Sequence, residues 1–137
     1  MARVLAIDYG YKRCGVAVTD PNKIIAQALT TLETARLMTF LDQYLLKETV
    51  ETLVVGLPKQ MNNQASEIEP HIHGFIKRFQ QKYPSIPVVR VDERFTSKIS
   101  QQTLLMAGAK KKQRQDKELI DAISATIILQ TYLAQNL

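Results

Sequence analysis

The stretch that decides the fold is residues 4–19, Val-Leu-Ala-Ile-Asp-Tyr-Gly-Tyr-Lys-Arg-Cys-Gly-Val-Ala-Val-Thr. It begins and ends with short strand-like runs, 4–7 and 16–19, and the segment between them contains two glycines. Apolar runs on either side of a glycine-containing turn are typical of a β-hairpin. We therefore predict two neighbouring antiparallel strands, with Asp8 at the end of the first.

The chain after this hairpin predicts one more antiparallel strand and then alternating helices and strands. Asp-Pro-Asn at 20–22 predicts a turn, and the next run is a strand joined by a connection too short for a crossover. Beyond it, apolar residues recur at helical spacing and alternate with short strand-like runs. The predicted strands are 24–32, 52–55 and 88–91, and the predicted helices are 37–45 with Thr34 as N-cap, 68–79, 96–106 and 119–133.

This order of elements, β-β-β-α-β-α-β-α-α, predicts the fold class. Right-handed crossovers add parallel strands to the antiparallel ones, which gives an α/β fold with a mixed five-stranded sheet and helices on both faces. The length of 137 residues and the apolar content of 45% fit one domain, 1–137, with a sizeable core.

Nearly all of the net positive charge lies in one short segment. The chain has 18 Lys and Arg, 13 Asp and Glu, and a net charge of +5, which excludes an acidic disordered tail. Charge runs are usually solvated loops, but a basic cluster also suits a partner that carries phosphates. The residues of this segment, 110–117, are Lys110, Lys111, Lys112, Arg114 and Lys117, against one acid, Asp116.

The sequence favours a cytoplasmic protein without a membrane partner. A carboxylate at position 8 interrupts the N-terminal apolar stretch before a signal peptide develops. No uninterrupted apolar run approaches the roughly 18 residues that span a bilayer. The single Cys14 can form no internal disulfide, and we interpret it as structural. His71 and His73, two residues apart on a predicted helix, share no face and are interpreted as surface or boundary residues.

Three carboxylates stand where a core-building pattern does not require them. Asp8 and Glu93 end predicted strands, and Asp121 lies in the first turns of the last helix. Ligands of open α/β sheets bind outside the carboxyl ends of the parallel strands. If the first and last crossover strands are adjacent, Asp8 and Glu93 come together. The small residues Ser124 and Ala125 then let the last helix bring Asp121 close to the sheet.

Such a cluster predicts a metal site, although each acid alone has a plainer interpretation. Carboxylates repel one another unless a cation joins them, and oxygen ligands suit Mg²⁺ or Mn²⁺. Two such ions about 3.5–4 Å apart hold the attacking water and the leaving oxygen of a phosphodiester. Taken singly, Asp8 could start a turn and Asp121 could complement a helix N-terminus. Glu93 could pair with Arg90 or Arg94.

Four blocks of the sequence carry a family pattern. They are Ala-Ile-Asp8-Tyr-Gly10-Tyr-Lys12-Arg13-Cys-Gly15-Val-Ala-Val-Thr-Asp20, Val-Val-Gly56-Leu-Pro58, Val-Asp92-Glu93-Arg94-Phe-Thr96-Ser, and the basic run 110–114 followed by Asp121-Ala-Ile-Ser-Ala-Thr-Ile-Ile-Leu-Gln130. In order and nearly end to end, these blocks resemble the signatures of the YqgF/RuvX family. The resemblance implies an RNase H-like fold related to Holliday junction resolvases, and an endonuclease that matures the 5′ end of pre-16S rRNA.

The resemblance also implies roles for particular residues. It makes Asp8, Glu93 and Asp121 the metal-binding catalytic acids, and it places Lys12, Arg13 and Arg94 at the substrate-facing rim. The chain departs from the family at Tyr9, where proline is frequent, and this ring either stacks on a base or packs. It departs again in the loop 60–64, which lacks glycine here, so that the shape of the loop stays open.

We therefore predict a Mg²⁺- or Mn²⁺-dependent endonuclease on structured nucleic acid, with precursor rRNA as substrate and the basic segment on backbone phosphates. One alternative is a Holliday junction resolvase on branched DNA, which needs a symmetric dimer. Another is a catalytically silent nucleic-acid-binding or transcription factor. An actin-like phosphotransferase shares the D-x-G-x₄-G pattern but needs two domains. We expect a monomer or a weak homodimer.

Overall fold

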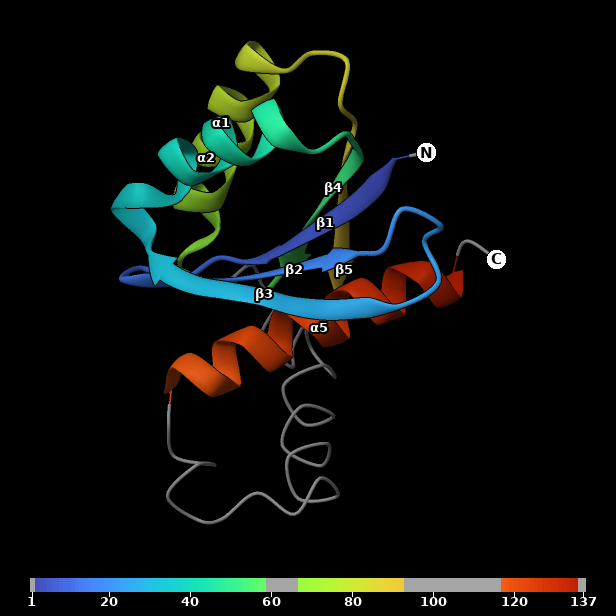
Figure 1. Ribbon diagram of the computed structural model, residues 1–137. Coiled ribbons are helices and arrows are strands. Elements are labelled where there is room, and N and C mark those ends of the chain that lie inside the picture. The colour runs from blue at the N-terminus through green and yellow to red at the C-terminus, as the bar shows by residue number, and fades with distance from the viewer. Residues whose placement is uncertain (1, 59–66, 93–116, 136–137) are drawn as a thin grey trace.

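The structure, a computed structural model, describes residues 2–58, 67–92 and 117–135, and within the last range it describes side chains only from 123 onward. The helix predicted at 96–106 and the glycine-free loop 60–64 lie outside the described residues. Figure 1 shows a single central sheet with helices packed above and below it. Within the described residues, no helix is both long and apolar enough to cross a membrane.

The sheet has five strands in the order β3-β2-β1-β4-β5. The first three are antiparallel neighbours, and the last two run parallel to β1. This arrangement confirms the predicted mixed sheet. The strands are β1 (Arg3–Asp8), β2 (Arg13–Thr19), β3 (Ala26–Glu33), β4 (Val50–Leu57) and β5 (Val88–Asp92).

The turn before β3 is held by Asp20, and it moves the start of that strand from the predicted position. The Asp20 carboxylate accepts hydrogen bonds from the backbone N–H groups of Ile24, at 2.8 Å, and Ile25, at 2.7 Å. These two residues therefore belong to the turn, and Lys23 before them takes a positive φ of 61°. Strand β3 begins only at Ala26.

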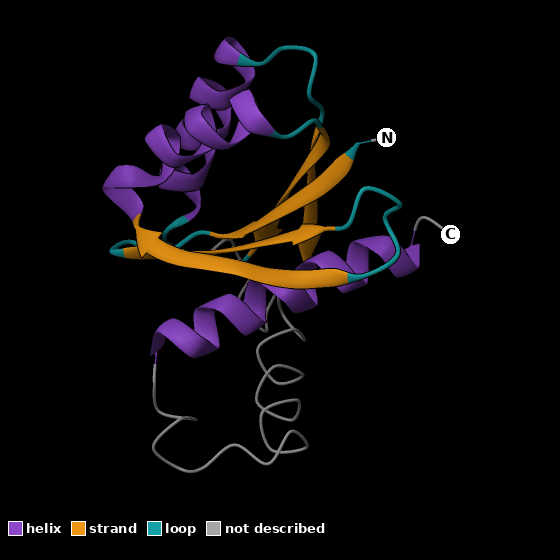
Figure 2. Cartoon of the chain, in the orientation of Figure 1, coloured by secondary structure: helices purple, strands orange, loops and turns teal. Residues whose placement is uncertain are grey.

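Helices cover both faces of the sheet, as predicted (Figure 2). The 3-10 turn η1 (Thr34–Arg36) leads into α1 (Leu37–Lys47), which packs with α2 (Glu69–Lys82) on one face. The last helix, α5 (Lys117–Gln135), crosses the other face. The prediction that Thr34 caps the first helix is wrong, because Thr34 lies inside η1 and makes no cap.

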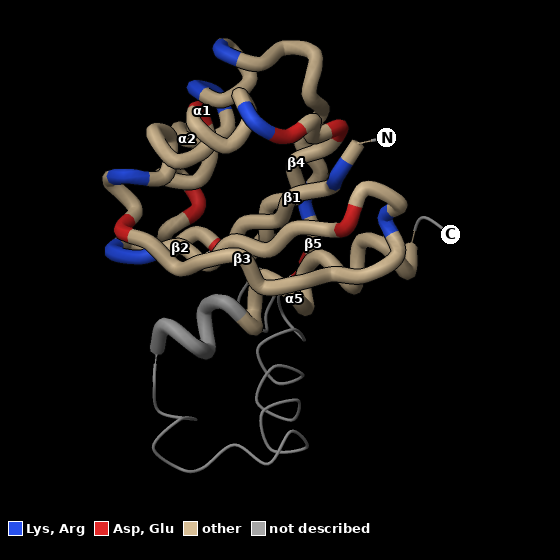
Figure 3. The backbone as a smooth tube through the Cα atoms, in the orientation of Figure 1, with Lys and Arg blue, Asp and Glu red and all other residues tan. Residues whose placement is uncertain are grey.

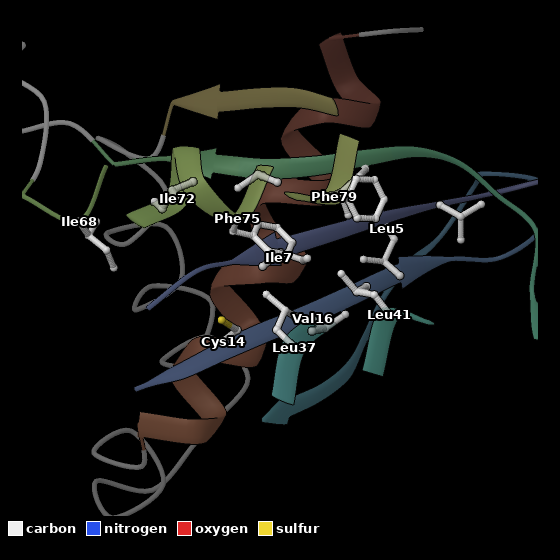
Figure 4. Packing of buried hydrophobic residues seen from close by; sticks show 13 residues of the cluster. Leu5, Ile7, Cys14, Val16, Leu37, Leu41, Ile68, Ile72, Phe75 and Phe79 are labelled. Carbon is white, nitrogen blue, oxygen red and sulfur yellow. The ribbon is translucent and has the colours of Figure 1, made fainter. Parts of the chain in front are cut away.

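Large side chains fill the space between the sheet and the α1/α2 layer. Alternate residues of β1, Leu5 and Ile7, point to this layer, as the two-residue period of a strand requires. Figure 4 shows them facing Phe75 and Phe79 of α2. All four residues are at most 2% exposed, so this layer buries much apolar area.

The opposite face of the sheet is built with smaller residues. Val4 and Ala6 of β1 point this way, together with Ala17 of β2. Helix α5 meets them with Ala125, which is fully buried, and with Ile128. Small residues on both sides let the helix backbone approach the strands closely.

Candidate active site

The carboxyl ends of three parallel strands form one edge of the sheet. In the register, Ile7 of β1 lies beside Val55 of β4, and Leu57 of β4 lies beside Asp92 of β5. Asp8 ends β1 at this edge and is partly buried. Because side chains alternate along a strand, Asp8 follows Ala6 onto the face that α5 covers.

The expected adjacency of the first and last crossover strands is wrong. Strand β4 lies between β1 and β5 and pairs with both. With neighbouring strands about 4.7–4.9 Å apart, the ends of β1 and β5 are separated by roughly 10 Å. Glu93, the residue after Asp92 in the sequence, lies outside the described residues.

Helix α5 begins at the same edge of the sheet as the end of β1. Its last turns, at Leu133 and Ala134, border Ile24 and Ile25 in the β2–β3 turn, at the opposite edge. The helix therefore runs back across the sheet, and its first turns lie toward the carboxyl end of β1 (Figure 1). Position 121 belongs to these first turns, one turn before the buried Ala125.

The loop after Asp8 is held firmly from inside. The Tyr9 ring packs against Phe75 with 5.5 Å between ring centroids, and its burial raises the pKa of the phenol. Of the two possibilities left open for Tyr9, the structure shows packing. A Cβ at Gly10 would collide with the carbonyl oxygen of Arg13, so the tight turn requires glycine there.

Thr34 ties the same loop from the other side. Its hydroxyl donates to the carbonyl oxygen of Gly10 at 2.7 Å, and its backbone N–H donates to that of Lys12 at 2.9 Å. Thr34 therefore stabilises this loop and does not cap a helix. Two exposed side chains, Tyr11 and Lys12, project from the loop so fixed, and Arg13 opens β2 opposite Glu33.

Tyr11 and His71 form a contact that the sequence did not predict. Their ring centroids lie 5.2 Å apart with an interplanar angle of 76°, an edge-on arrangement. The two residues are 60 positions apart in the chain, so only the packing of α2 on the sheet brings them together. The sequence signal for an aromatic contact on this loop was the pair of tyrosines, Tyr9 and Tyr11, on either side of Gly10. The structure turns the first ring inward and the second outward.

A partly buried ion pair anchors the first turn of α2 to the same edge. Arg90 of β5 donates to the Glu69 carboxylate at 2.7 Å and to the carbonyl oxygen of Gly56 at 2.8 Å. The Oε2 atom of Glu69 is buried and has no hydrogen-bond partner within the described part of the chain. The sequence left Arg90 open as a partner of Glu93, and the structure shows Arg90 bound to Glu69.

The sequence as a whole matches one protein family. A family model described as RuvX, Holliday junction resolvase, aligns with residues 2–135. The chain belongs to the RuvX family. Its relatives include a protein of Christiangramia forsetii, 56% identical over 133 residues, covering 97% of this chain and 98% of the relative. Another, from Flavobacterium psychrophilum, is 50% identical over 137 residues and covers both chains fully. Both are named as candidate pre-16S rRNA nucleases.

Solved structures resemble this RuvX chain in fold. Thermus thermophilus RuvC in complex with a Holliday junction substrate superposes with a TM-score of 0.61 at 17% identity, covering 99% of this chain and 97% of the other. A second structure of RuvC from this organism gives 0.56 at 15% identity, covering 98% and 96%. The RNase H-like fold expected from the sequence is thereby confirmed.

The remaining predicted residues of the RuvX chain fall into two groups. Cys14 is fully buried, with its sulfur 3.4 Å from the Thr34 hydroxyl, and both His71 and His73 are exposed, as predicted. Among the described side chains no three His, Cys, Asp or Glu gather in one place, and the charged positions lie mainly in loops, near strand ends and along the helices (Figure 3). Outside the described residues lie Glu93, Arg94, Lys110, Lys111, Lys112 and Arg114, and the side chain of Asp121 is also not described.

Proposed function

We propose that this RuvX-family chain is a metal-dependent endonuclease that processes the 5′ end of precursor 16S rRNA. Relatives at least half identical over nearly their whole lengths carry the corresponding name. One structural observation supports the proposal: Asp8 ends β1 at the same edge of the sheet at which α5 begins. We further propose a single domain over 1–137 and a cytoplasmic location, with which one buried cysteine agrees.

We propose that Asp8, Glu93 and Asp121 hold Mg²⁺ or Mn²⁺. The described part of the site fits such an ion, because a carboxylate at the carboxyl edge offers hard oxygen ligands on the face that α5 approaches. A bound divalent ion would supply Lewis-acid stabilisation of the phosphodiester and a lower pKa for the attacking water.

The other residues of the edge hold and orient the substrate. Lys12 stands exposed on a loop that Thr34 fixes, so its charge can meet a backbone phosphate without reordering the chain. We assign the same phosphate contacts to Arg13, Arg94 and the basic residues Lys110, Lys111, Lys112 and Arg114. Because such contacts release counterions, binding should weaken steeply with salt. The products should carry a 5′-phosphate and a 3′-hydroxyl.

The replacement Asp8→Asn tests this function. It keeps the shape of the side chain and removes the charge, so cleavage of a precursor 16S leader RNA in Mg²⁺ should fall about a thousandfold, equivalent to roughly 4 kcal/mol of lost transition-state stabilisation. RNA binding in EDTA should stay close to that of the wild type. A catalytically silent binding protein would show no metal-dependent cleavage to lose.

Glu51→Gln is the matched control. Glu51 is the second residue of β4, at the far end of the sheet, and pairs with Lys23 on the surface at 2.9 Å. This variant removes one carboxylate charge away from the candidate site and should cleave like the wild type. Wild-type cleavage by Asp8→Asn would remove the proposal.

A second candidate, Holliday junction cleavage, is favoured by the family description and by the fold shared with RuvC, whose structure holds a junction substrate. Incubating the protein with a four-way DNA junction and with the leader RNA, each with mapped ends, separates the two activities. Paired, symmetric cuts in the junction require a dimer, which sedimentation at the assay concentration would detect.

A further inference from the structure

Tyr11 presents an aromatic ring to solvent three residues after Asp8. Its side chain is 59% exposed, whereas Tyr9 on the same loop is turned inward against Phe75. The two tyrosines therefore have different roles although they stand two positions apart. Of these two rings, that of Tyr11 is the one available to a molecule bound at the carboxyl edge.

The backbone that carries Tyr11 is fixed before any ligand arrives. Hydrogen bonds from Thr34 hold the carbonyl groups of Gly10 and Lys12, the residues on either side of Tyr11. The tight approach of Gly10 to Arg13 and the packing of Tyr9 immobilise the loop further. A ring on such a loop loses little conformational freedom on binding, so contact with it yields more net affinity.

His71 supports the ring from α2. The His71 ring contacts the Tyr11 ring edge-on, with 5.2 Å between the ring centroids. This contact leaves more than half of Tyr11 exposed to solvent. The turn that carries His71 is itself held to the sheet, because Glu69, two residues earlier, binds Arg90. Two separate elements thus set the orientation of one exposed aromatic ring.

We propose that Tyr11, positioned by His71, is a stacking platform for one unpaired base of the RNA, and that Lys12 binds a phosphate next to that base. This inference rests on the proposed function and deepens it. An aromatic face with a neighbouring cation is how proteins bind single-stranded nucleic acid, since every unpaired base offers a π-face. The platform selects substrates with an unpaired nucleotide beside the scissile bond, and it accepts any of the four bases.

Binding of a short single-stranded RNA that carries a fluorescent adenine analogue tests the platform. The measurement uses the full chain in EDTA, so that no cleavage occurs. The wild type should quench the analogue by stacking, and Tyr11→Ala should lose the quenching and bind about tenfold more weakly, which corresponds to about 1.4 kcal/mol. Tyr11→Phe should behave like the wild type, because the phenyl ring still stacks.

Two further variants, Lys12→Ala and His71→Ala, distinguish stacking by Tyr11 from the charge of Lys12 and from the contact with His71. Tyr11→Ala should leave the salt dependence of binding unchanged, whereas Lys12→Ala should reduce its slope by about one unit. His71→Ala should reduce the quenching in part, because the ring loses its support. A perfect RNA duplex should bind equally well to the wild type and to Tyr11→Ala, since its bases are already stacked.

The outcomes distinguish the platform from the nuclease function. Wild-type affinity and quenching in Tyr11→Ala, with leader RNA still cleaved at the wild-type KM, would overturn the platform and leave the function standing. Strong quenching by a wild type that cleaves no RNA would support the platform and remove the function. Thermal melting verifies that each variant is folded at the assay temperature.

Discussion

The face of the sheet that α1 and α2 cover is built from large side chains, whereas the face that α5 covers contains alanine at its centre. Phe75 and Phe79 fill the first layer, and Ala6 and Ala125 meet in the second. Large side chains separate a helix from a sheet and bury much apolar area, and small ones let the backbones approach. The first face is therefore suited to stability, and the second to bringing the start of α5 to the carboxyl edge.

Truncating the large side chains should have the largest effect on stability. Phe79→Ala leaves a cavity next to Leu5 and should reduce the free energy of unfolding by about 3–5 kcal/mol, measured by urea denaturation. Because Phe79 lies away from the carboxyl edge, cleavage per folded molecule should change little. Leu46→Ala, at a position 87% exposed on α1, is the control and should unfold like the wild type. A large loss of turnover in folded Phe79→Ala would mean that this face also shapes the site.

Enlarging the small side chains should have a smaller effect on stability and a larger one on activity. Ala125→Leu forces α5 away from the sheet and should cost about 1–3 kcal/mol of unfolding free energy. A displacement of 1 Å at Asp121 would lower kcat about 100-fold. Ala134→Leu, the same change at an exposed position of the last turn, should affect neither quantity. Unchanged kcat in Ala125→Leu would contradict the role given to this face.

The smallest effect should come from the polar contact that joins α1 to the end of α2. Hydrogen bonds from Lys82 and Tyr83 hold the pKa of the Asp42 carboxyl below its usual 3.8. Because the pKa of Asp42 is lower in the folded chain, its ionised carboxylate stabilises the fold at pH values above the ordinary pKa of 3.8. This stabilisation is lost as the pH falls through the lowered pKa. Asp42→Asn should therefore cost no more than about 1 kcal/mol at neutral pH. In thermal melts its deficit should shrink as the pH is lowered below about 4. A deficit that is independent of pH would show that the charge contributes nothing.

Patterns local in the chain predicted the elements that local physics determines. The apolar runs around Asp8, the helical stripe from Ile68 to Phe79 and the stop near Pro84 all reappear in the structure. Three carboxylates at element ends pointed to a metal site, and Asp8 does lie at the carboxyl edge. The roles of Asp8, Glu93 and Asp121 stay predictions until the variants are measured.

Contacts between distant segments were beyond the reach of such patterns. A run of residues such as 52–55 identifies a strand but carries no mark of its neighbours, so the place of β4 between β1 and β5 was missed. Threonine is a frequent helix cap, but the hydroxyl of Thr34 instead binds the carbonyl oxygen of Gly10, 24 positions earlier in the chain. The Glu69–Arg90 pair likewise depends on how α2 packs on the sheet.

The sequence by itself determined the strands, the helices α1, α2 and α5, the mixed sheet and the family of this chain, because hydrophobic periodicity and short motifs are properties of neighbouring residues. Only the tertiary structure decided the strand order, the different packing of the two faces and the pairing of Tyr11 with His71. These features depend on which surfaces meet when the chain is compact. Burial turns Tyr9 into a packing residue and leaves Tyr11, two positions later, open to a partner.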